Sequence, residues 1–197
     1  ASGLMHELRH RVPQVVPQAL SPRNLIPRNW ARQAPARGLR RVLLAGVTRP
    51  LLVSQVQTDV GGIEELPVSG GPVVLVANHA SHLDTPLVLD SLPAACRRRT
   101  AVAVIPGSAL TSTLRTVASA AALNTVPLHS DVCRELLGQG WNVLVFGEPS
   151  RSADGFVGDF TTDAAELAIE RGVRVVPIGI RGSFAAMPRG RNRVVLG

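Results

Sequence analysis

Four runs of apolar residues, each about as long as a β-strand, recur in the second part of the chain. They read PVVLVA (72–77), TAVAVI (100–105), WNVLVF (141–146) and VRVVPIGI (173–180). The first of them is continuously apolar rather than alternating, which is typical of a strand buried on both faces. Because such strands occur in parallel sheets covered by helices on both sides, this feature constrains the fold strongly.

The sequence between these runs is predicted to be helical. We expect helices at 83–92, 109–123, 131–137 and 161–171, a short strand at 125–128 and the start of another at 193–196. This alternation predicts an α/β fold with a central, mostly parallel sheet flanked by helices. In such folds the functional sites lie at strand ends.

The excess positive charge lies in the first quarter of the chain. The 197 residues carry a formal net charge of +7, and all 21 basic residues are arginine. Residues 1–50 hold nine arginines and one acid, whereas residues 51–197 hold twelve arginines and thirteen acids. We therefore expect a basic, Pro- and Arg-rich N-terminal arm over residues 1–50 and a nearly neutral domain over residues 51–197.

Part of this arm has a helical pattern. Apolar residues recur at helical spacing between Ala36 and Leu52, with arginines among them, which predicts a short basic amphipathic helix, interrupted or restarted at Pro50. The pattern suits a helix that lies on a membrane and, nearly as well, one that packs on the protein core. With aromatic residues at only 3%, an anionic membrane surface is the expected partner rather than nucleic acid.

Three features bear on the cellular location. The best apolar stretch, residues 42–56, is interrupted by Arg49-Pro50, and a spanning helix needs about 20 mostly apolar residues. The start of the chain lacks the pattern of a signal peptide. Two cysteines are too few for a disulfide framework, which favours a reducing compartment. We expect a peripheral protein on the cytoplasmic face of a membrane.

The densest group of reactive side chains follows the first apolar run, in NHASHLD (78–84). His79 and Asp84 are five positions apart at a predicted strand-to-helix turn, so the start of the helix can bring the carboxylate back to the imidazole. A carboxylate bonded to one ring nitrogen leaves the other free to accept a hydroxyl proton. The alternative is structural, with Asp84, Asn78 and Ser81 serving as cap or turn residues.

Two further segments lie at or near the ends of predicted strands. FGEPSRS (146–152) places Glu148 and Arg151 on one loop, and a guanidinium is suited to bidentate binding of an anionic group. VVPIGI (175–180) contains Pro177 inside an apolar run, which predicts an edge strand or a bulge.

In this order, the three segments resemble the glycerolipid acyltransferases of the lysophosphatidic acid acyltransferase type. NHASHLD is similar to the NHxSxxD block that contains the HxxxxD motif of this family. FGEPSRS is similar to its FPEGTRS block, and VVPIGI to its VVPV/I block. The resemblance runs from about residue 56 to residue 197.

The resemblance implies transfer of a fatty acyl group from acyl-CoA or acyl carrier protein to a hydroxyl of a lysophospholipid or a related glycerolipid or glycolipid. His79 would be the general base and Asp84 its orienting partner, with no metal and no cofactor beyond the acyl donor. The resemblance also implies, as one alternative, that the acyltransferase domain over residues 51–197 is truncated at its C-terminus. The substrate-binding residues that it implies are Asn78, Ser81, Gly147, Glu148, Ser150, Arg151 and Pro177.

Two blocks depart from the family pattern. Gly147 stands where FPEGTRS has its proline, and Pro149 stands where it has its glycine. The conformational freedom of glycine is therefore lost at position 149. Where the family has a phosphate-binding arginine, this chain has Ser130, and Arg134 or Arg98 would be substitutes. The acceptor therefore stays open. An acyl-thioester hydrolase and a non-catalytic lipid- or acyl-binding module are the alternative functions.

Overall fold

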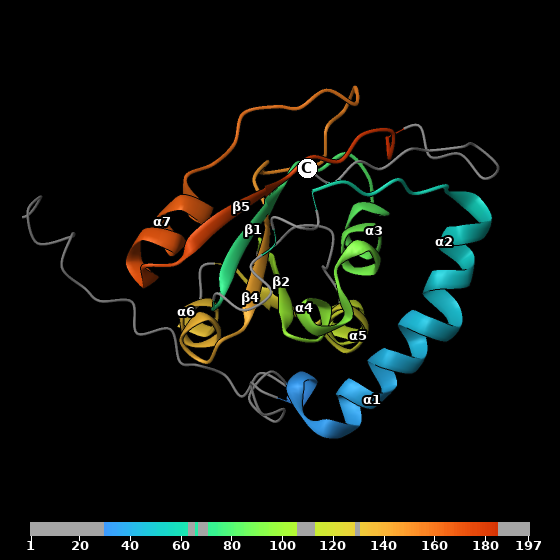
Figure 1. Ribbon diagram of the computed structural model, residues 1–197, viewed down its shortest axis with the longest axis horizontal. Helices are drawn as coiled ribbons and strands as arrows, with labels where there is room; N and C mark the ends of the chain where they lie inside the picture. Colours follow the sequence, from blue (N-terminus) through green and yellow to red (C-terminus); the bar gives the residue numbers. More distant parts are fainter. Residues whose placement is uncertain (1–29, 63–65, 67–70, 106–112, 129–130, 185–197) are drawn as a thin grey trace, which may run out of the picture. The chain divides into compact units, whose positions relative to one another are not determined.

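The computed structural model describes residues 30–62, 66, 71–105, 113–128 and 131–184. Its described part contains one sheet with the spatial order β3-β2-β4-β1-β5, and all neighbouring strands are parallel (Figure 1). The strands are β1 (Val73–Ala77), β2 (Thr100–Val104), β3 (Thr125–Pro127), β4 (Asn142–Phe146) and β5 (Arg174–Ile178). The predicted α/β fold with a central, mostly parallel sheet flanked by helices is confirmed.

Helices connect the strands. They are α3 (Asp84–Ser91), α4 (Ala94–Arg98), α5 (Thr113–Leu123), α6 (Asp131–Gly138) and α7 (Asp163–Arg171). Four of these correspond to predicted helices. The sequence prediction missed α4, because a helix of five residues is too short to show a hydrophobic period. The strand predicted at 193–196 lies outside the described residues.

A long helical segment precedes the sheet. After a 3-10 turn (Trp30–Arg32), it consists of α1 (Ala34–Leu43), a π-helical segment (Leu44–Thr48) and α2 (Arg49–Gln55). The helix is thus widened before Pro50 rather than interrupted there, and the Arg49 N–H donates to the Leu44 carbonyl. We attribute the wide turn to Pro50, whose ring would clash with a carbonyl of a regular α-helix.

This helical segment crosses the domain boundary predicted at residues 50–51, and that boundary stays a prediction. Residues 1–29 of the predicted arm lie outside the described residues. Within the described part of the chain, none of the helices combines the length and the apolar character that a membrane span requires.

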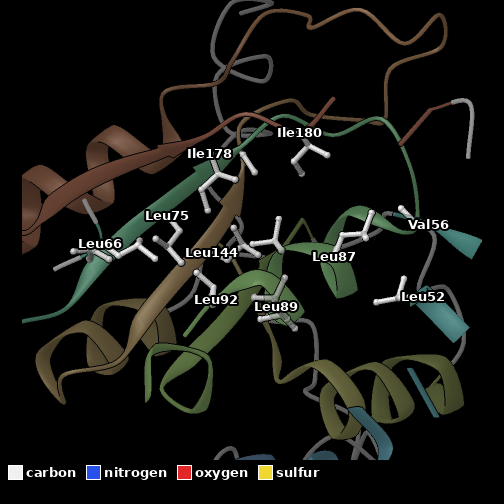
Figure 2. Close-up of a cluster of buried hydrophobic side chains, with 14 residues drawn as sticks. Leu52, Val56, Leu66, Leu75, Leu87, Leu89, Leu92, Leu144, Ile178 and Ile180 are labelled. Carbon is white, nitrogen blue, oxygen red and sulfur yellow. The ribbon is translucent and has the colours of Figure 1, made fainter. Parts of the chain in front are cut away.

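Two hydrophobic cores cover the two faces of the sheet, because successive residues of a strand point to opposite sides. Leu75 of β1 lies in the core that also contains Leu52 of α2 and Leu87 of α3 (Figure 2). Val74, the residue before Leu75 in β1, lies in the core on the other face of the sheet, together with Leu136 of α6. Helix α2 is therefore docked on the same face of the sheet as α3.

We expect Leu52→Ala to lower the free energy of unfolding by about 2–4 kcal/mol, because it removes a buried side chain and leaves a cavity. Leu51, the preceding residue, is 55% exposed, whereas Leu52 is 6% exposed. Leu51→Ala is the matched control and should change the stability by less than about 0.5 kcal/mol. Urea denaturation followed by circular dichroism measures both variants, and equal effects would contradict the docking of α2.

Candidate active site

The loops that follow β1 and β4 lie together at the carboxyl end of the sheet. The two strands are parallel neighbours, so their carboxyl ends meet at one edge. Beyond the strands, the Gly147 N–H donates to the Ala77 carbonyl and the Ser152 N–H donates to the His79 carbonyl, both at 2.8 Å. The first and second sequence motifs therefore form one site.

The predicted pair of His79 and Asp84 is present. Nδ1 of His79 lies 3.0 Å from Oδ2 of Asp84. The same oxygen accepts the backbone N–H groups of Ala80 and Ser81, each at 2.7 Å. A carboxylate oxygen that already accepts two N–H groups favours the proton on Nδ1, which leaves Nε2 as an acceptor. The geometry of a general base with its orienting carboxylate is therefore in place.

The burial of this pair is uneven. The side chain of Asp84 is 0% exposed and that of His79 is 21% exposed, so solvent reaches the imidazole but not the carboxylate. Asp84 is the first residue of α3, where the helix dipole stabilises a negative charge. Its second oxygen, Oδ1, is buried and has no hydrogen-bond partner within the described ranges. The charge of Asp84 thus depends on the three donors at Oδ2 and on the helix.

The imidazole ring is also held by an aromatic contact. Phe146, the last residue of β4, stacks on His79 with ring centroids 4.1 Å apart and an interplanar angle of 26°. Phe146 packs in turn against the core that α2 and α3 cover. The plane of the imidazole is therefore set by a side chain whose own position is fixed by packing. The sequence motifs gave no sign of this contact.

Asn78 and Ser81 have structural contacts at the turn. Asn78 is buried; its amide nitrogen donates to the Ile180 carbonyl at 3.0 Å, and its amide oxygen accepts the Ile180 N–H at 2.7 Å. The Ser81 hydroxyl oxygen accepts the Leu83 N–H at 3.2 Å. Asn78 thus joins the end of β1 to the segment after β5. A role for either residue in substrate binding stays a prediction.

Glu148 connects the two loops of the site. It is 5% exposed, its Oε2 accepts the His79 backbone N–H at 3.2 Å, and its Oε1 accepts the Gly158 N–H at 2.9 Å. An ionised carboxylate can only accept hydrogen bonds, and both oxygens are engaged by the backbone. In this geometry Glu148 positions His79 and the loop after β4, and its predicted role in substrate binding stays a prediction.

The exchange of glycine and proline around Glu148 has a local explanation at position 147. The Gly147 N–H donates to the Ala77 carbonyl at the end of β1. A proline at position 147 could not make this hydrogen bond, because it has no N–H. A Cβ at this position would also collide with the ring of Phe160. The left-handed conformation that this loop requires occurs at Gly155, with φ +85°, away from Pro149.

Ser150 and Arg151 are exposed on the same loop, next to the turn that carries His79. The pKa of His82 is lowered by partial burial and by the positive charges of Arg151 and His79, which outweigh the opposing effect of Asp84. Arg151 is thus close enough to the HxxxxD turn for its charge to act there. Its predicted role in substrate binding, like that of Ser150, stays a prediction.

Pro177 lies in β5, opposite Val76 of β1, and is exposed. Strand β5 forms one edge of the described sheet, so the edge strand predicted from this proline is confirmed. A contact of Pro177 with substrate stays a prediction.

The predicted substitutes for the missing phosphate-binding arginine lie elsewhere. Ser130 itself is outside the described residues. Nε of Arg134 pairs with Glu170 at 2.6 Å, which joins α6 to α7 on the face of the sheet opposite to Phe146. Arg98 ends α4 just before β2, at the amino end of the sheet. Neither arginine reaches the carboxyl end beside His79 on the α3 face.

We expect Glu148→Gln to lower the free energy of unfolding by about 1–3 kcal/mol, because the amide NH₂ must face one of two buried N–H donors. Glu135→Gln is the matched control, since Glu135 is exposed on α6, and should change stability by less than about 0.5 kcal/mol. Urea denaturation at neutral pH measures both. An unchanged stability for Glu148→Gln would contradict the two hydrogen bonds from Glu148 to the backbone of His79 and Gly158.

Comparisons of the sequence with known proteins agree with this geometry. The chain is 35% identical over 146 residues to a chloroplastic 1-acyl-sn-glycerol-3-phosphate acyltransferase of Brassica napus, covering 71% of this chain and 41% of that protein. It is 34% identical over 144 residues to a chloroplastic enzyme of the same description from Arabidopsis thaliana, covering 70% and 39%. The chain thus spans about two fifths of the length of these relatives.

A solved structure and a family model give the same result. The 1-acyl-sn-glycerophosphate (LPA) acyltransferase PlsC of Thermotoga maritima superposes with a TM-score of 0.61 at 26% identity, covering 88% of this chain and 72% of that one. The model of the Acyltransferase family matches residues 57–181, which include all three motifs and both backbone partners of Glu148. This chain belongs to the acyltransferase family.

Proposed function

We propose that this protein transfers a fatty acyl group from acyl-CoA or acyl carrier protein to a hydroxyl of a lysophospholipid or a related glycerolipid or glycolipid. The observation that carries this proposal is the imidazole of His79, oriented through Nδ1 by a buried carboxylate and accessible to solvent. Across the described ranges, no serine or cysteine side chain hydrogen-bonds to this ring. We therefore assign the role of nucleophile to the hydroxyl of the acceptor.

In the proposed mechanism, Nε2 of His79 removes the proton of the acceptor hydroxyl as its oxygen attacks the thioester carbonyl. Asp84 stabilises the resulting imidazolium. Backbone N–H groups of the loop after β4 would stabilise the oxyanion of the tetrahedral intermediate. Its collapse breaks the C–S bond, and the leaving thiolate takes the proton from Nε2. The products are the acylated lipid and the free thiol of the carrier.

Two features of the site fit a lipid acceptor. Arg151 supplies an exposed guanidinium on the loop that is hydrogen-bonded to the His79 turn, and this group is suited to bind the phosphate of a lysophospholipid. Three exposed phenylalanines lie near the loop of Glu148, and an acyl chain would cover apolar surface of this kind. They are Phe156, Phe160 and Phe184, which are 77%, 46% and 49% exposed.

His79→Ala should lower the rate of acyl transfer by about 10²–10⁴-fold, because it removes the general base. The assay incubates the protein with labelled acyl-CoA and a panel of lysophospholipid and glycolipid acceptors, and identifies the product lipid. His82→Ala, at an exposed neighbouring position, is the control and should keep most of the activity. A folded His79→Ala protein with full activity would exclude the mechanism.

The same assay separates the two alternatives. Release of free CoA at an unchanged rate without any acceptor would identify an acyl-thioester hydrolase. Binding of acyl-CoA or lipid with no turnover would identify a non-catalytic binding module.

We further propose that residues 1–50 attach the protein to an anionic membrane surface on the cytoplasmic face. The helical segment from α1 to α2 exposes apolar side chains among its arginines, as interfacial helices do. These side chains include Leu39, Val42, Val47 and Leu51, which are 53%, 66%, 50% and 55% exposed.

The double substitution Leu39→Ser/Val42→Ser should weaken binding to vesicles of phosphatidylcholine and phosphatidylglycerol by about tenfold or more, because burial of each side chain contributes about 1.5–3 kcal/mol. Ile169→Ser removes an equally apolar side chain from α7 that is 80% exposed, and should have little effect. Vesicle sedimentation measures both. Equal losses would mean that α1 does not contact the bilayer.

A further inference from the structure

A cavity lies at the amino end of the sheet. Its volume is about 910 Å³, within the usual range for small-ligand sites. Its walls come from α1, the π-helical segment, α2, α3 and α4. Arg99 and Trp141, which directly precede β2 and β4, complete them. Figure 1 shows α1 and α4 at the end of the sheet where these strands begin.

This cavity is separate from the candidate active site. His79 and Glu148 follow the carboxyl ends of β1 and β4, whereas Trp141 precedes the amino end of β4. A strand of five residues spans about 16 Å. The length of the sheet therefore separates the cavity from the general base.

The wall of the cavity is strongly positive. It contains seven arginines but one acidic residue, Asp90. The arginines come from two regions far apart in the sequence: Arg37, Arg40, Arg41 and Arg49 from the N-terminal helical segment, and Arg97–Arg99 from α4 and the residue after it. A concave surface lined by one sign of charge concentrates ligands of the opposite sign.

One of these arginines is part of the structure of the wall. Nε of Arg40 donates to the Ala121 carbonyl at 2.9 Å, and its Nη2 donates to the carbonyls of Ala31 and Ala120 at 2.7 and 2.8 Å. Burial and the positive charge of Arg32 lower the pKa of Arg40 to about 10. Arg40 is still protonated at neutral pH, so it holds α1 against α5 and adds its charge to the cavity.

Three others have contacts of their own, and two of them are partly charge-compensated. Asp90 lies 3.5 Å from Nη1 of Arg97 and 3.7 Å from Nε of Arg49, so two cations share one carboxylate. Nη1 of Arg99 donates to the Gly140 carbonyl at 3.5 Å, which neutralises no charge. These contacts orient guanidiniums at the rim but leave a large positive excess.

The remaining three guanidiniums are uncompensated. Arg37, Arg41 and Arg98 are exposed and form no ion pair or side-chain hydrogen bond with any of the residues that the structure describes. Arg37 and Arg41 are four residues apart on α1, a spacing at which like charges repel on one face of a helix. Arg98 lies on α4, far from them in the sequence but in the wall of the same cavity. An anion bound between these side chains would relieve the repulsion.

We propose that this cavity binds the phosphate groups of a polyanionic ligand through Arg37, Arg41 and Arg98. The planar fork of a guanidinium matches phosphate oxygens, and charge-assisted hydrogen bonds of this kind are among the strongest in proteins. The site has room for a ligand, because a Cβ added at Gly38 would meet no atom within 4 Å. The phosphate can come from an anionic phospholipid headgroup or from a soluble phosphate ester.

The test measures binding of two probes to the full chain: inorganic pyrophosphate, by calorimetry, and vesicles of phosphatidylcholine with or without phosphatidic acid, by sedimentation. Arg41→Gln/Arg98→Gln should weaken binding at least tenfold, because it removes two charge-assisted contacts. Arg171→Gln/Arg174→Gln removes the same charge at exposed positions on α7 and β5, and is the matched control. Gly38→Leu fills the cavity without changing its charge and should weaken binding as well.

The outcomes are distinct. Pyrophosphate binding that both cavity variants weaken supports the site for soluble phosphates, and an effect confined to phosphatidic acid vesicles supports a lipid headgroup. Undetectable binding of both probes, or equal losses in the cavity and control variants, overturns the proposal. His79→Ala should bind both probes as the unmodified protein does, since the site does not depend on acyl transfer. Weakened binding by this variant would place the anion in the active site and overturn the proposal too.

Discussion

The rest of the site depends on one interaction, the buried carboxylate of Asp84 and the three N–H donors at its Oδ2. A charge with no solvent exposure is costly unless it is hydrogen-bonded, and here the donors are the His79 ring and the two backbone groups that follow it. The turn between β1 and α3 therefore has to close around the carboxylate. The same closure holds the imidazole and starts the helix, so folding of the turn and orientation of the base are one event.

Two other buried polar side chains extend this constraint to the neighbouring strands. Asn78 exchanges two hydrogen bonds with the backbone of Ile180 after β5, and Glu148 after β4 accepts the backbone N–H of His79. The carboxyl ends of three adjacent strands are thereby joined at one point. Such a network fixes the base against a rigid sheet, while side chains of the loop such as Arg151 stay exposed to solvent.

The sequence predicted the parts of the molecule that depend on local pattern. Apolar runs located the strands, and the spacing of His79 and Asp84 indicated the base and its partner, because one turn of chain brings them together. The π-helical segment, the stacking of Phe146 and the double acceptor role of Glu148 were missed, since each depends on a contact made by the folded chain. Spacing alone could not show that the glutamate of the second motif accepts a hydrogen bond from the backbone of the histidine in the first.

The charge distribution illustrates the same limit. Along the sequence, the positive excess belongs to residues 1–50, and the remainder is nearly neutral. In the fold, Arg97–Arg99 of the neutral part lie in the same cavity wall as Arg37 and Arg41, while the guanidinium of Arg40 is held in place by backbone carbonyls. Electrostatic interactions act through space, so arginines from the arm and from the nearly neutral domain contribute to one positive cavity. The sheet then separates two tasks, with acyl chemistry proposed at its carboxyl end and anion binding at its amino end.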